Sequence, residues 1–238
     1  MLGTSEVAGQ CATFGSFDLG EDIEVTCEDS CLTLTAPGIA SVASGGGAEY
    51  DVDVIPYDPP YAYNAGSVAI ATGDDVYSGT IPLGFSFNFF GNDYTQCRIS
   101  SNGWFSFTLG ENAGYNPNGP IPNANSPLNA VLAVHSDLNP STCGDVRYGT
   151  FGTAPCRQFV VSWNSVCQFS CTSQLVSAQA VLYEGTNVIE LYLENRPTCS
   201  WGNATMGIQN IDGTVGIPAP GYNTGNWNER NVALRFSS

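Results

Sequence analysis

The sequence of 238 residues contains no lysine, and all six of its basic residues are arginines. Without lysine there is no residue for a Schiff base, for the lysine of a phosphate-binding loop or for a Lys–Asn isopeptide cross-link. A single histidine, His135, leaves little material for a histidine-based active site. The sequence also lacks an apolar run of about 18 residues, so we expect no membrane-spanning helix.

The charge of the chain is strongly one-sided, with a formal net charge of −16. Such a field repels nucleic acid and anionic membranes, so we expect neither a nucleic-acid partner nor membrane insertion. Thirteen of the 22 acidic residues lie between Glu6 and Asp75, a stretch without a basic residue. The acidity indicates a soluble extracellular surface, and binding of divalent cations is the alternative.

Nine cysteines indicate an oxidising, extracellular compartment in which disulfides stabilise the fold. Two pairs share a C-x3-C spacing that can close a small disulfide loop, and a third pair flanks a predicted hairpin. A zinc site is the disfavoured alternative, because one histidine is a poor supply of further ligands. The cysteines predicted to form disulfides are Cys27 with Cys31, Cys143 with Cys156, and Cys167 with Cys171. The odd total leaves one thiol over, and we expect Cys11, in the terminal segment, to link subunits.

Turn residues are abundant, with 27 glycines and 14 prolines, and no long helical periodicity appears. Phenylalanines alternate with small or polar residues in the run GFSFNFF over residues 84–90, which is typical of a strand with one buried face. Asn102-Gly103 predicts a type I′ hairpin turn. About a dozen such short strands predict an all-β fold, an antiparallel β-sandwich of jelly-roll or immunoglobulin-like character.

The domain organisation follows from a change in composition. Residues 1–48 are acidic and end in a glycine run, so we expect a small N-terminal β segment or partial immunoglobulin-like module there. Residues 49–238 contain the dense strand signals and form the predicted main sandwich. The first residues lack the features of a signal peptide, so we expect a processed chain or an excerpt of a longer one.

Acidic residues in turns are the candidate metal ligands. Calcium prefers carboxylate and carbonyl oxygens, which loops rich in Asp and Asn supply, although the same residues are ordinary in turns. The candidate calcium ligands are Asp74, Asp75, Asp137 and Asp145. No other cofactor is expected.

Three tyrosines, Tyr57, Tyr61 and Tyr63, lie in a proline-rich extended segment. Their rings could stack on sugars, or they could cover part of the sandwich. The neighbours His135, Ser136 and Asp137 contain hydrolase residue types, but adjacent residues of one strand cannot converge on a substrate as a triad does. We therefore expect no catalytic residues and no enzyme.

The run IPLGFSFNFFGNDYTQCRISSNGWFSF, residues 81–107, resembles the nidogen-like extracellular pattern. Further motifs in the same order, among them HSDLNPSTCG, VLYEGTNVIELYLENRP and PGYNTGNWNERNVALRF, resemble a gliding-motility-associated domain of large Bacteroidota surface proteins. The resemblance covers roughly residues 25–238. It implies export by the type IX secretion system and a binding or structural role at the cell surface, and it implies no catalytic residues.

Two classes of function remain. The first is an extracellular structural or adhesive module, a repeat or subunit of a surface filament, whose partners are copies of itself or neighbouring domains. Sandwich domains can assemble by adding a strand to an open edge, and the N-terminal segment is a candidate donor. The second is a glycan- or calcium-binding domain of a secreted adhesin.

Overall fold

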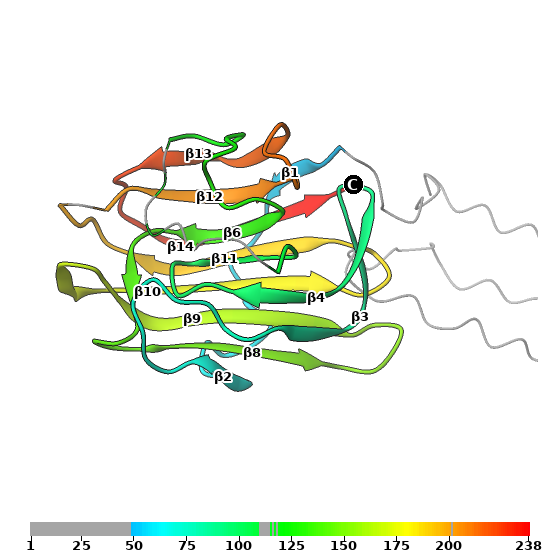
Figure 1. Cartoon of the computed structure of the whole chain (residues 1–238), viewed down its shortest axis with the longest axis horizontal. Helices are drawn as coiled ribbons and strands as arrows, with labels where there is room; N and C mark the ends of the chain where they lie inside the picture. The colour runs from blue at the N-terminus through cyan, green and yellow to red at the C-terminus, as the bar shows by residue number, and fades with distance from the viewer. Residues whose placement is uncertain (1–48, 110–114, 116, 118, 201) are drawn as a thin grey trace, which may run out of the picture. The chain divides into compact units, whose positions relative to one another are not determined.

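The computed structural model of the chain describes residues 49–109, 115, 117, 119–200 and 202–238. Within this part of the chain all regular secondary structure is β, arranged as two antiparallel sheets of one compact unit (Figure 1). The predicted all-β sandwich is thereby confirmed. The predicted segment 1–48 lies outside the described residues, so the domain boundary at residue 48 stays a prediction.

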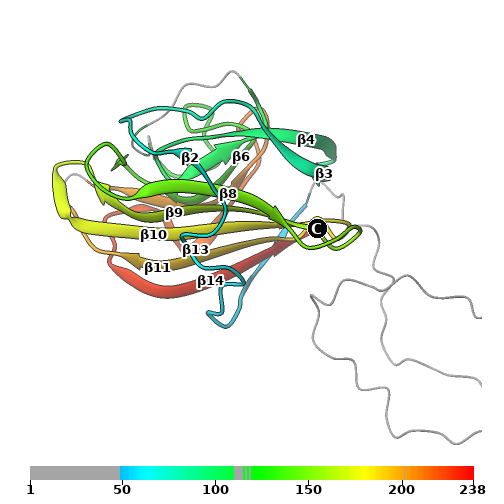
Figure 2. The same ribbon diagram turned by 90° about the horizontal axis from the view of Figure 1, so that it is seen from below.

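Fourteen strands of the described residues make up the two sheets. The eight-stranded sheet has the order β1 (Asp51–Val54), β14 (Glu229–Ser237), β11 (Ile189–Arg196), β10 (Cys171–Tyr183), β9 (Gln158–Gln168), β8 (Asp145–Phe151) and β2 (Ser67–Ile70), with β7 (Leu138–Asn139) also paired to β9. The six-stranded sheet has the order β13 (Gly216–Gly225), β12 (Ala204–Gln209), β6 (Ala130–His135), β5 (Trp104–Ser106), β4 (Asn92–Ile99) and β3 (Ile81–Phe89). Figure 2 shows β3, β4 and β6 in one layer and β9, β10, β11 and β14 in the other.

The core lies between the two sheets and is built by alternation. In β3 the side chains of Phe85, Phe87 and Phe89 are buried, whereas the residues between them are exposed or half-buried. Trp163 of β9 packs in the same core and donates its indole N–H to the carbonyl oxygen of Ser100 at 3.0 Å. The bond ties the two sheets together at the end of β4.

The central strands are buried on both faces. All six residues of β6 are buried, and the first four alternate between a second cluster around Trp104 and Ile121 and the main core. Strands with two covered faces appear in sequence as continuous apolar runs. The sequence AVLAVH of β6 is such a run, and β6 lies in the middle of the six-stranded sheet.

The turn between β4 and β5 differs from the predicted type. Gly103 has a φ of 79°, but Asn102 is not among the residues with positive φ, so the turn is not type I′. The turn instead closes with a hydrogen bond from the amide of Ser100 to the carbonyl of Trp104. A Cβ atom on Gly103 would overlap the carbonyl of Val134, so glycine is required by both space and backbone angle.

The four described cysteines predicted to form disulfides, Cys143, Cys156, Cys167 and Cys171, are all disulfide-bonded, but the predicted pairs Cys143–Cys156 and Cys167–Cys171 are wrong. Cys143 bonds Cys167, with 5.5 Å between their Cα atoms, and Cys171 bonds Cys199 at 5.9 Å. Cys156 is also disulfide-bonded, but to a residue other than Cys143. Cysteine spacing alone could not predict these pairings, because distance along the sequence does not determine which strand ends meet in the fold.

The β8–β9 ladder explains the first correction. Its register runs from Asp145 opposite Asn164 to Phe151 opposite Gln158. Cys143 therefore lies at the open end beside Cys167, while Cys156 lies at the turn, about 20 Å along the strands. The second correction has the same kind of cause, because Cys167 and Cys171 flank a turn in which Gln168, rather than Cys167, stands opposite Cys171.

Cys97 is the free cysteine among the described residues, and it is fully buried in the core. Its thiol cannot reach another subunit from there. The predicted linking thiol, Cys11, and the predicted pair Cys27 and Cys31 lie outside the described residues.

Candidate functional site

Three of the four predicted calcium ligands come together in space. Carboxylate oxygens of Asp74, Asp75 and Asp137 all lie within 4.8 Å of one another. Asp74 and Asp75 follow β2, and Asp137 lies between β6 and β7, so two loops distant in sequence build the cluster. We call these three residues the acidic cluster.

Asn102 holds the two loops in place. Its side chain is fully buried, and its amide nitrogen donates to a carboxylate oxygen of Asp75 at 2.9 Å. Its amide oxygen accepts from the backbone N–H of Leu138 at 2.8 Å, next to Asp137. A single side chain in the β4–β5 turn thus positions both halves of the acidic cluster.

Asn139 supports the other side of the cluster. Its amide nitrogen donates to Oδ2 of Asp74 at 2.7 Å. The second oxygen of Asp74, Oδ1, is shielded from solvent and accepts no hydrogen bond. Oδ1 of Asp74 therefore lies in the cluster without a hydrogen-bond donor.

The electrostatics of the cluster are unfavourable for three bare carboxylates. Burial, together with the charges of Asp75 and Asp74, raises the pKa of Asp137 from 3.8 to about 7. Burial and the charge of Asp75 also raise the pKa of Asp74. A bound cation would relieve this repulsion, as would a proton.

Asp145, the fourth predicted ligand, lies elsewhere. It forms an ion pair with Arg147 at 2.7 Å and accepts a hydrogen bond from Asn164 at 3.1 Å. Burial would raise the pKa of Asp145, but hydrogen bonds from Arg147 and Asn164 outweigh burial and lower it. Its charge is already compensated within the chain.

The acidic cluster fits a divalent cation by its chemistry. Three carboxylates provide hard oxygen ligands, and calcium takes about six to eight of them, with carbonyl groups and water completing the set. The amides of Asn102 and Asn139 lie against the same carboxylates. The sequence did not predict that these two residues support the cluster, because its only signal there is an Asn beside a Gly or a Pro in a turn.

The three tyrosines of the proline-rich segment pack on the eight-stranded sheet. The ring of Tyr61 stacks on Phe151 with 4.4 Å between centroids, and Tyr57 meets Tyr192 edge-on at 6.4 Å. The hydroxyl groups of Tyr57 and Tyr63 are hydrogen-bonded at 3.0 Å. These contacts favour the covering role over stacking on sugars.

His135 and Ser136 are buried, with 1% and 0% of their surface exposed. The imidazole ring of His135 meets Trp104 edge-on, with 6.2 Å between ring centroids. Neither side chain is open to a substrate, in agreement with the interpretation of this stretch as structural.

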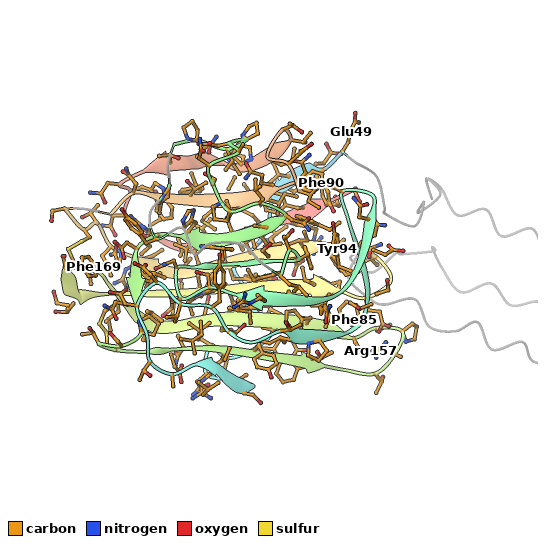
Figure 3. All side chains as sticks on the ribbon, in the orientation of Figure 1. Glu49, Phe85, Phe90, Tyr94, Arg157 and Phe169 are labelled. Atoms are coloured by element: carbon orange, nitrogen blue, oxygen red, sulfur yellow. A yellow bond between two sulfur atoms is a disulfide. The ribbon has the colours of Figure 1, made fainter. Side chains whose placement is uncertain are left out.

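Phe169 is a surface feature that the sequence did not single out. It lies between Cys167 and Cys171, both disulfide-bonded, yet 45% of its surface is exposed. Its backbone N–H donates to the carbonyl of Asp137 at 2.9 Å, so the β9–β10 turn adjoins the acidic cluster. Figure 3 shows Phe169 at the opposite end of the sandwich from Glu49 and Arg157.

The fold and the cross-links define an all-β sandwich stabilised by disulfides, a class typical of oxidising compartments. The described residues contain no helix long and apolar enough to cross a membrane. A family model described as NIDO related matches residues 55–229, and the chain belongs to this NIDO-related family. The nidogen-like resemblance is thereby confirmed. No curated protein and no solved structure matches the chain.

Proposed function

We propose that this chain is an extracellular structural or adhesive module, a domain of a larger surface protein or a subunit of a surface filament. The observation that carries the proposal is the β9–β10 turn. Two disulfides hold this turn at the end of the sandwich and present Phe169 to solvent. A rigid, exposed aromatic side chain is a suitable anchor for contact with another protein, because little conformational entropy is lost on binding.

The proposal includes the finer expectations from the sequence, namely a Bacteroidota source, export by the type IX system and the absence of catalysis. The buried state of His135 supports the absence of catalysis. The disulfides support a location outside the cell.

Bead clustering and electron microscopy test the adhesive role. Beads coated with the full chain are expected to cluster, and concentrated protein is expected to form filaments or paired contacts in micrographs. The Phe169→Ser variant should reduce clustering. The matched control is Ile211→Ser, which removes a side chain that is 53% exposed in the β12–β13 connection. Dispersed beads and strictly monomeric particles with the unaltered chain would refute the adhesive role.

Calcium binding is the second candidate function, and the acidic cluster specifically favours it. The cation would join the loop after β2 to the loop before β7 and so stiffen the end of the sandwich next to Phe169. Calcium titration followed by thermal melting tests this, with an increase in Tm expected. A Tm that does not change with calcium would refute calcium binding and leave only the structural or adhesive role.

A further inference from the structure

The first strand of the sandwich has an open edge. β1 pairs with β14 on one side, and no other described strand pairs with it. An open edge presents unpaired backbone N–H and C=O groups that another strand can use. The question is which groups β1 offers and what kind of strand they suit.

The register fixes which backbone groups face outward. The amide of Ile55 donates to the carbonyl of Ala233 at 3.0 Å, and the β1–β14 register places Asp53 opposite Arg235. Hydrogen-bonded pairs alternate along an antiparallel ladder. The N–H and C=O groups of Val52 and Val54 therefore point away from β14, toward the open edge.

The side chains of β1 alternate as well. Asp51 and Asp53 are exposed on the outer face, and Glu49 precedes them in the same alternation. Val52 packs against the core on the inner face, and Val54 follows it with 77% of its surface exposed. The edge is thus acidic on one face and apolar on the other.

Other edges of the sandwich are less suited to accept a strand. β13 carries Pro218 and Pro220, and β3 carries Pro82, so each lacks amide donors. The ladder of β2 is interrupted by a register shift between Val68 and Ile70. β1 has neither proline nor a register shift.

We propose that the β1 edge binds an extended segment of a different protein, with basic residues alternating with apolar ones. Its basic side chains would lie beside Asp51 and Asp53, and its apolar side chains would cover Val54. The proposal deepens the adhesive role by naming the chemistry of a partner, and it concerns a different surface from Phe169.

The charges argue against a second copy of this chain as the occupant. β1 paired with β1 would bring the carboxylates of Asp51 and Asp53 against their own kind, which destabilises cross-strand pairs. The chain has no lysine, and residues 1–48 contain no basic residue that would suit this edge. Arg235 lies opposite Asp53 in the β1–β14 ladder, but its guanidinium group forms an ion pair with Glu190 at 2.6 Å.

The probe is a short synthetic peptide of alternating lysine and valine, added to the full chain labelled with ¹⁵N. Hydrogen exchange of the Val52 and Val54 amides is expected to slow on binding, because the peptide strand accepts hydrogen bonds from these N–H groups or shields them from water. A peptide of the same composition with its lysines and valines in separate blocks controls for diffuse attraction to an acidic protein. It should bind more weakly and leave the two amides unprotected.

Two changes test the backbone pairing itself. Val54→Pro removes one outward N–H and should weaken peptide binding about tenfold, the effect expected for a lost strand hydrogen bond. The control variant Val54→Thr keeps the N–H and should bind the peptide as tightly as the unaltered chain does. An alternating peptide N-methylated at every second residue should also bind weakly, and this control leaves the protein unaltered if Val54→Pro fails to fold.

Equal binding of the alternating, blocked and N-methylated peptides would overturn the proposal, as would protection of amides away from β1. Self-association of the unaltered chain through β1, seen as protection of Val52 and Val54 that rises with protein concentration, would overturn the selectivity for a different protein. Failure here leaves bead clustering through Phe169 intact, and loss of clustering leaves peptide binding at β1 intact, so the two proposals fail separately.

Discussion

Individual carboxylates in this chain behave according to their neighbours. Asp137 and Asp145 are both half-buried loop or strand-end residues. Asp137 faces two further carboxylates, whereas Asp145 faces Arg147 and Asn164. Their pKa values consequently move in opposite directions, which makes the pair a matched test of the acidic cluster.

The stability of the cation-free protein should fall as Asp137 ionises. Because the pKa of Asp137 is raised from 3.8 to about 7 in the folded state, its stabilising contribution is complete below about pH 4 and is lost as the pH rises through about 7. Calcium binding requires the ionised form, so the increase in Tm produced by calcium should grow over the same pH range. Thermal melting in chelator and in calcium measures both effects.

Asp137→Asn should remove this pH dependence and most of the calcium response, with a Tm in chelator at pH 8 at least equal to that of the unaltered chain. Asp145→Asn is the control. The lowered pKa of Asp145 means that its stabilising contribution is present above its unfolded pKa and lost at lower pH, and the calcium response should remain. Equal calcium responses in all three proteins would show that the acidic cluster is not the site.

The acidic cluster shows how far sequence reasoning reaches at this scale. The residue type and the loop setting were sufficient to select Asp74, Asp75 and Asp137. The same criteria selected Asp145, because they do not show that Arg147 neutralises it. They also did not show that Asn102 supports the cluster, because this role depends on contacts with residues 27 and 36 positions away.

Two disulfides cross-link the β9–β10 hairpin to its neighbours. The disulfides Cys143–Cys167 and Cys171–Cys199 close loops of similar length, with sequence separations of 24 and 28. Loop-closure entropy then predicts nearly equal effects. Replacing either pair by serine should lower the free energy of unfolding by about 2–4 kcal/mol, measured by urea denaturation.

Cys97→Ala is the control for the hairpin, because Cys97 is not in a disulfide. Its stability should remain as sensitive to reducing agent as that of the unaltered chain. If removing both cross-links leaves the midpoint of denaturation unchanged, the hairpin is held by packing alone.

The tyrosine-containing segment of residues 55–63 covers the outer face of the eight-stranded sheet. Tyr61→Ala removes the ring stacked on Phe151 and should lower the free energy of unfolding by about 1–2 kcal/mol, since Tyr61 is only partly buried. Tyr115→Ala, at a residue that is 55% exposed, should have little effect. A glycan array that responds to Tyr61→Ala without any change in stability would instead support sugar binding.

The molecule as a whole carries a net charge of −16, and its self-repulsion opposes the compact state. Raising sodium chloride from about 10 mM to about 150 mM should therefore raise Tm at pH 8, because the Debye length falls from about 30 Å to about 8 Å. Near the isoelectric point of about 4.1 the same salt change should have little effect. A Tm independent of salt at pH 8 would mean that the charges are too far apart to matter.

The sequence by itself determined the fold class, because period-2 alternation and frequent turns are local properties of the chain. The strands at residues 81–89 and 130–135 follow from their apolar pattern alone. Other strands have no such local signal: β2 and β7 are short, and β13 contains two prolines and several glycines.

Only the tertiary structure decided what depends on partners distant in sequence. The disulfide pairing depended on the register of β8 and β9, which local spacing does not contain. The acidic cluster likewise required two loops to meet around Asn102. Local periodicity sets the element that each residue joins, whereas strand register and sheet packing set its neighbours, and the candidate functions of this chain depend on those neighbours.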